Sequence, residues 1–103
     1  KHHIVFKSQG GLDFELNYKR LTPEQHRGEN GPHMNRGTDL RYKRELQEKL
    51  FKMFTDEYYT TKQIRKMLGI RPGQMKVFRK LPQYPEGLKR EDVIRRLMGG
   101  RLY

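Results

Sequence analysis

The spacing of apolar residues changes along the chain, and the change predicts where its helices lie. In the first 38 residues the apolar positions form only short runs, and the run at residues 4–6 is typical of a strand. Residues 17–21 form a second candidate for an extended segment. Thr22 followed by Pro23 has the pattern of a helix N-terminus, but glycines follow almost at once, so this helix is expected to be short. The predicted order is strand, loop, strand, short helix.

A longer helix is predicted from Asp39, which is its expected N-cap. Leu46, Leu50 and Phe54 are spaced one turn apart, so they lie on one face of a helix that ends near residue 54. This apolar stripe is expected to lie over the rest of the domain or to join the two halves of the chain.

Three shorter helical segments are predicted after residue 55. Thr60 or Thr61 caps the first, which Gly69 ends, and the others run over about 72–80 and 90–98. The stretch between the last two is too rich in Pro and Gly for a regular helix. This order is typical of a small helix-turn-helix with a reduced wing.

The composition predicts a small hydrophobic core and a polyanionic partner. The chain has 103 residues, of which 33% are hydrophobic, and a formal net charge of +11. Residues 1–54 contribute +4 and residues 55–103 contribute +7, and we place a domain boundary between them. This charge predicts binding to DNA or another polyanion.

The apolar runs and the absence of cysteine exclude several classes of protein. The longest uninterrupted apolar run has three residues, which predicts no membrane span and no signal peptide, and therefore a soluble, cytoplasmic protein. Without cysteine there is no disulfide or thiolate metal site, so a metal would be held by His, Asn, Asp or Glu. Because the chain begins at Lys1, further residues upstream are expected.

All four histidines lie within the first 33 residues: His2, His3, His26 and His33. Chance clustering, or a tag remnant for the tandem pair, would also give this pattern. The context favours chemistry, because the pair leads into IVFKSQGG and His26 follows a helix cap. Hydrolysis of a phosphodiester needs a cation near the scissile phosphate and a base for water, and histidine serves either need near neutral pH.

The segment HHIVFKSQGGLDFELNYKRLTPEQHRGENGPH resembles the phage-type HNH endonucleases, which have a ββα-metal fold. In that family a His-His pair ends or follows the first strand, a Gly-Gly loop leads to an Asn, and the closing His lies on a short helix. The resemblance covers residues 1 to about 54 and is closest to the branch without a cysteine-bound zinc. It implies an α+β fold, metal-dependent cleavage of DNA, and a phage or bacterial host.

The resemblance also implies a role for each residue of the motif. His2 and His26 correspond to metal ligands, His3 to the general base, and Asn17 to the residue that ties the loop and orients the base; an ordinary turn-forming Asn is the alternative for Asn17. Neighbouring strand residues face opposite sides, so one His can hold a metal while the next faces water. The third ligand is His33 or Asn30, with His33 favoured by ligand type. Such a site suits Zn, Ni, Co or Mn, and Mg where phosphate supplies oxygen ligands.

The second half is similar to MerR-like or excisionase-like helix-turn-helix modules, in which the segment at 71–80 would lie toward the major groove. The alternative is a helical cap that only completes the core. The candidate DNA contacts from both halves, each of which is otherwise a solvated surface residue, are Lys7, Arg27, Arg36, Arg71, Gln74, Lys76 and Arg79.

Taken together, these features predict a metal-dependent DNA endonuclease whose C-terminal module tethers DNA. The alternatives are a non-enzymatic DNA-binding regulator and an RNA-binding protein, in both of which the histidines would be structural. Cutting both strands would need a homodimer or two sequential events.

Overall fold

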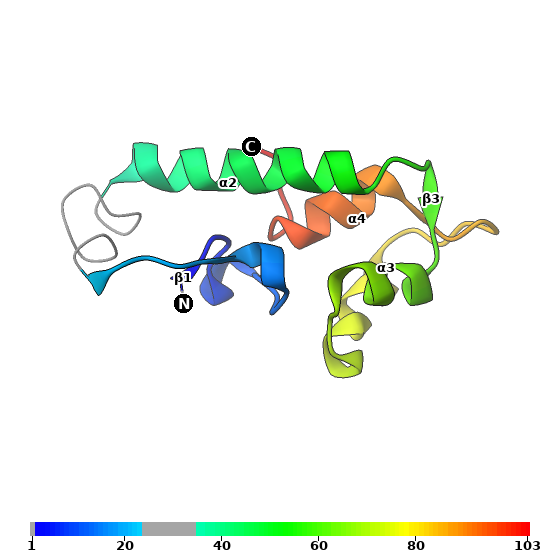
Figure 1. The fold of residues 1–103 in the computed structure, drawn as a ribbon. Helices are drawn as coiled ribbons and strands as arrows, with labels where there is room; N and C mark the ends of the chain where they lie inside the picture. The colour runs from blue at the N-terminus through cyan, green and yellow to red at the C-terminus, as the bar shows by residue number, and fades with distance from the viewer. Residues whose placement is uncertain (1, 24–34) are drawn as a thin grey trace.

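The computed structural model describes residues 2–23 and 35–103 and has an α+β fold (Figure 1). The first region contains strands β1 (His2–His3) and β2 (Tyr18–Lys19) with the 3-10 segments η1 (Lys7–Gln9) and η2 (Glu15–Asn17) between them. Helix α2 (Arg36–Met53) follows. The second region contains β3 (Tyr58–Tyr59), α3 (Thr61–Leu68), the 3-10 segment η3 (Pro72–Lys80), β4 (Leu88–Lys89) and α4 (Arg90–Leu97). The predicted α+β class is confirmed at this level.

The first sheet is shorter than the sequence predicts, and its first strand lies two residues nearer the start of the chain. β1 pairs antiparallel with β2, with His2 opposite Lys19 and His3 opposite Tyr18. The strand expected at residues 4–6 is wrong, because the side chain of Asn17, rather than a neighbouring strand, bonds the backbone of Val5. The second extended segment is confirmed at Tyr18–Lys19. The short helix expected after Thr22 lies almost wholly outside the described residues.

Helix α2 begins four residues before the expected position. Asn35 is its N-cap and accepts a hydrogen bond from the Thr38 amide at 3.0 Å, so the prediction that Asp39 caps it is wrong. The Asp39 carboxylate instead pairs with Lys43, 2.8 Å away, one turn along the helix. Because α2 packs against α4 and buries Leu46, it joins the two regions, which is one of the two arrangements expected of its apolar stripe (Figure 1).

The capping signals of the second region are confirmed. Thr60 caps α3 with a reciprocal capping box to Gln63, and Gly69 ends the helix in the left-handed conformation at φ 67°. The segment after Pro72 is a 3-10 helix, with Gln74 N–H bonded to the carbonyl of Arg71 three residues earlier. β3 pairs antiparallel with β4 through Tyr58–Lys89 and Tyr59–Leu88.

One cluster of buried apolar side chains extends from Ile4 to Met98 and takes in both regions. A polar contact also joins the two regions: the Arg96 guanidinium donates a hydrogen bond to the Gly10 carbonyl at 2.9 Å. This packing brings the loop after β1 against α4 and η3. None of the helices in the described part of the chain is long and apolar enough to cross a membrane.

Candidate functional site

The two histidines of β1 lie in different environments. His2 is 5% exposed, and its ring packs edge-on against Phe6 with 5.3 Å between centroids. The side chain of His3 is 21% exposed and packs edge-on against Tyr18 at 4.8 Å. The alternation of side chains along a strand therefore places one imidazole in the interior and leaves the next within reach of solvent.

Asp13 is the main polar partner of His3. Its Oδ1 lies 2.8 Å from His3 Nε2 and accepts a hydrogen bond from the Tyr18 hydroxyl at 3.1 Å. Its Oδ2 accepts from Gln74 Nε2 at 2.8 Å, while the Asp13 amide donates to Gln74 Oε1 at 3.0 Å. The carboxylate also lies 3.8 Å from the Lys7 ammonium. Asp13 is thus fixed from β1, β2 and η3 together.

These contacts keep Asp13 ionised. The hydrogen bond with His3, then that with Gln74, lowers the pKa of Asp13 to about 2 against an opposing effect of burial. An ionised carboxylate only accepts hydrogen bonds, so the His3 nitrogen facing it, Nε2, carries the proton. In the neutral ring Nδ1 then holds the lone pair that can accept a proton.

Tyr18 responds to the same carboxylate. Burial, followed by the hydrogen bond and the negative charge of Asp13, raises the pKa of Tyr18, while the positive charge of Arg71 acts in the opposite direction. Tyr18 therefore stays a neutral donor to Asp13 at neutral pH. Arg71, from the second region, is close enough to act electrostatically on this site.

Asn17 closes the loop that carries Asp13. It is fully buried, its Oδ1 accepts from the Val5 amide at 2.8 Å, and its Nδ2 donates to the carbonyls of Val5 and Leu12 at 3.2 and 2.9 Å. The chain also comes close at Gly11, where any Cβ would overlap the Val5 carbonyl oxygen. Asn17 and Gly11 together fix the loop as far as Leu12, the residue before Asp13.

The proposed metal ligands lie only partly within the described residues. His2 is described, whereas His26, His33 and Asn30 fall in the segment 24–34 outside the description. Among residues 2–23 and 35–103, no three His, Cys, Asp or Glu side chains converge as a metal site would require. The donor set of three imidazoles fits a borderline divalent ion by ligand type.

The predicted DNA contacts are spread over both regions. Lys7 borders Asp13, and Arg36 lies exposed at the start of α2, while Arg27 falls outside the described residues. Lys76 and Arg79 are exposed on η3. Gln74 differs from these, because both the oxygen and the nitrogen of its side-chain amide bond Asp13.

Asp13 was not among the site residues predicted from the sequence, although its position in the chain indicates a role. Asp13 is the first carboxylate of the chain and lies in the loop between a histidine pair and Asn17. A strand, loop and strand bring the middle of the loop back toward the first strand. The partner Gln74 had no such signal, because it is 61 residues away in the sequence.

Comparisons with protein-family models, curated proteins and solved structures found no match to this chain. The resemblance to HNH endonucleases and to helix-turn-helix modules therefore stays a prediction. Its support comes from the residues around His3 and from the charge of the second region.

Proposed function

We propose that this chain is a metal-dependent endonuclease of the HNH type, which hydrolyses phosphodiester bonds in DNA with His3 as general base. One observation carries the proposal: a partly exposed imidazole is held by an ionised carboxylate, Asp13, directly beside a buried histidine on the same strand. Hydrolysis of a phosphodiester needs a base, a group that orients the base and a nearby residue that can bind a metal. His3, the Asp13 carboxylate and His2 are residues of these three kinds.

The first step assigned to the chain is removal of a proton from water. His3 Nδ1 accepts this proton, and the imidazolium that forms is stabilised by the Asp13 carboxylate 2.8 Å from Nε2. The edge-on ring of Tyr18 limits rotation of the imidazole. A positioned general base of this kind contributes roughly 10²- to 10⁴-fold to the rate.

Asp13 and Asn17 are positioning residues in this scheme. Asp13 fixes the tautomer and orientation of His3, and Gln74 and Tyr18 fix Asp13 in turn. Asn17 holds the loop on both sides through Val5 and Leu12. Loss of either side chain is therefore expected to slow cleavage without removing a group that reacts.

His2 and His26, with His33 or Asn30 as third ligand, would hold a divalent ion. Bound there, the ion would neutralise charge on the scissile phosphate and on the departing oxygen. Imidazole ligands favour Zn, Ni, Co or Mn, and Mg is suitable where phosphate oxygens complete the shell. Replacing His33 and Asn30 separately by Ala identifies the third ligand, because the variant that loses metal affinity marks it.

Nicking of supercoiled plasmid in the presence of a series of divalent ions tests the proposal. We expect metal-dependent nicking by the wild-type protein and a loss of about 10²-fold or more in His3→Ala. Lys52→Ala, which changes an exposed side chain on α2, is the control and should nick at the wild-type rate. If folded wild-type protein binds DNA but never nicks it with any ion, the regulator alternative replaces the enzyme.

A further inference from the structure

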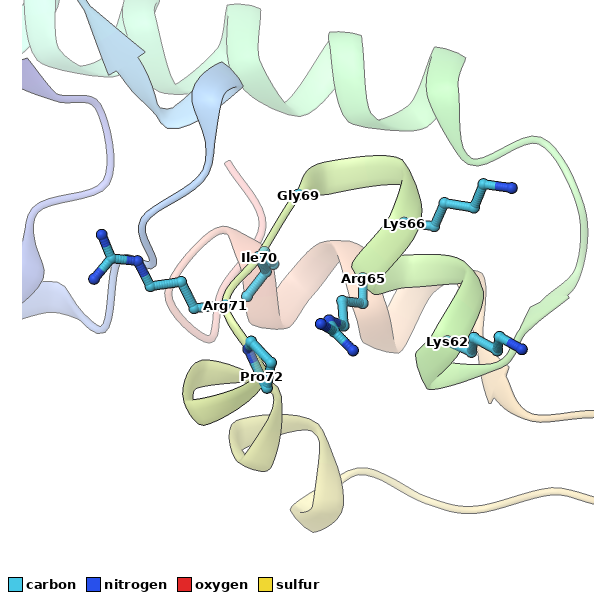
Figure 2. Close-up of a pocket in the computed structure, with 7 residues that line it drawn as sticks. All are labelled: Lys62, Arg65, Lys66, Gly69, Ile70, Arg71 and Pro72. Atoms are coloured by element: carbon cyan, nitrogen blue, oxygen red, sulfur yellow. The ribbon is translucent and has the colours of Figure 1, made fainter.

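A groove lined by basic side chains lies between α3 and η3 (Figure 2). Its volume is about 540 Å³. We call it the basic groove and define it by four cationic residues, which are Lys62, Arg65, Lys66 and Arg71, around Gly69, Ile70 and Pro72. Figure 2 shows Arg65 extending from α3 toward Pro72, while Arg71 extends to the other side.

The geometry of α3 gathers three of these four cations on one face. Lys62, Arg65 and Lys66 have the i, i+3, i+4 spacing that places side chains side by side on a helix, and all three are exposed. Ile64 and Leu68, on the opposite face, are buried in the core. The helix therefore exposes a charged face because its apolar face is fixed inward; in Figure 2 the Lys62 and Lys66 side chains extend away from Pro72, on the side opposite to Arg71.

The described residues do not compensate the positive charge of the basic groove. Within residues 2–23 and 35–103, none of the four cations pairs with a carboxylate, and no acidic residue lines the groove. Elsewhere Lys19, Lys43 and Arg95 do pair with carboxylates, on α2 and α4. Like charges held together without a counter-charge attract an anion.

The backbone at the groove is open to close approach. At Gly69 no atom lies within 4 Å of the position that a Cβ would take, and the same is true at Gly73. The open space at Gly69, which lines the groove, leaves room for an anion to approach the backbone there. Among the described residues, nothing lies over Gly73 either, so an extended polyanion has room beyond the groove.

The basic groove is also connected to the candidate site. Arg71 belongs to the groove and acts electrostatically on Tyr18, which bonds Asp13. Gln74, one turn further along η3, bonds Asp13 directly. Arg71 and Gln74 thus connect the basic groove to the residues around His3.

We propose that the basic groove binds the phosphate backbone of duplex DNA and directs it to His3. The inference rests on the proposed function, which supplies DNA as the polyanion. It assigns Lys62, Arg65 and Lys66, on α3, to backbone contacts alongside Arg71, and these contacts position DNA without reading its sequence.

Salt-dependent binding of a short fluorescent DNA duplex, measured by anisotropy in EDTA so that nothing is cut, tests the groove. The groove variant combines Arg65→Gln with Arg71→Gln, and the control combines Arg44→Gln with Lys49→Gln, which removes the same charge from exposed positions of α2. We expect the groove variant to make log K against log salt less steep by about 2 between about 50 and 200 mM, since each lost phosphate contact contributes about 0.9. The control should keep the wild-type slope.

Equal slopes in the groove variant and the control would overturn the inference, because binding would then depend only on net charge. Lys62→Gln with Lys66→Gln provides a second groove variant should the first fail to fold, as judged by circular dichroism. An RNA duplex of the same sequence that alone shows the groove-dependent slope would also overturn it. Because the binding assay contains no free metal, a groove-dependent slope in a protein that never nicks plasmid would retain the groove and reject only the nuclease.

Discussion

Replacing Asp13 by Asn tests the pairing on which the candidate site depends. The substitution keeps the size of the side chain but removes the charge that faces His3 and Lys7. The new side chain still accepts hydrogen bonds through its one oxygen, whereas its NH₂ group opposes the NH₂ group that Gln74 donates. The variant should therefore fold, but the hydrogen bond from this side chain to His3 should be weaker.

The size and pH dependence of the effect follow from the pKa of Asp13. Its value in the folded state is about 2, below the ordinary 3.8, so the folded protein binds protons less readily than the unfolded chain. The stabilisation is complete above pH 3.8 and is lost as the pH falls through about 2. The Asp13 side chain is 27% exposed, so solvent screening reduces the free energy that corresponds to the full pKa shift. We therefore expect the Asp13→Asn variant to lose about 1 to 2 kcal/mol of unfolding free energy at pH 7.

Urea denaturation of wild type and Asp13→Asn at a series of pH values between 7 and 2 measures this difference. The difference in unfolding free energy should be constant down to about pH 4 and shrink below it. Glu86→Gln, at an exposed carboxylate of the second region, is the control and should change stability by less than about 0.5 kcal/mol throughout. A difference between Asp13→Asn and wild type that is absent at pH 7, or unchanged at low pH, would refute the pairing.

Three further predictions test the packing that supports the site. Asn17→Ala leaves three buried backbone groups without their partner and should cost about 3 kcal/mol in urea denaturation; a loss below about 1 kcal/mol would contradict its loop-closing role. Asp39→Ala removes the ion-pair partner of Lys43, a residue that is 1% exposed, and should cost about 3 to 5 kcal/mol; Lys43→Met should recover most of this loss in the double variant, and no recovery would contradict a buried ion pair. Gly99→Ala should lower the thermal midpoint more than Gly100→Ala, because both have positive φ but only at Gly99 would a Cβ overlap a backbone oxygen; equal midpoints would contradict the close approach.

Local signals in the sequence were sufficient for the elements whose ends depend on a few neighbouring residues. Thr60 and Gly69 fix the ends of α3 through hydrogen bonds within the segment itself. For α2, Asn35 and Asp39 are both good capping residues, and the sequence does not choose between them. In the structure Asn35 caps the helix, while the Asp39 carboxylate pairs with the buried Lys43 one turn further along.

The candidate site could be predicted only in part, because one of the residues that bond Asp13, Gln74, comes from the other region. The resemblance to the HNH motif points to His3 and Asn17. Asp13 becomes the partner of His3 because the loop returns to β1, and Gln74 joins them because η3 packs against that loop. No spacing in the sequence encodes a contact of this kind, since it depends on how the two regions pack into one core.

The most direct test of the central claim is chemical rescue of His3→Ala in the plasmid-nicking assay. If His3 is the general base, the variant binds DNA as the wild type does, nicks about 10²-fold or more slowly, and regains activity when imidazole is added. Imidazole should not accelerate the wild-type protein. Nicking by His3→Ala at the wild-type rate without imidazole would contradict the assignment of His3 and, with it, the site built on Asp13.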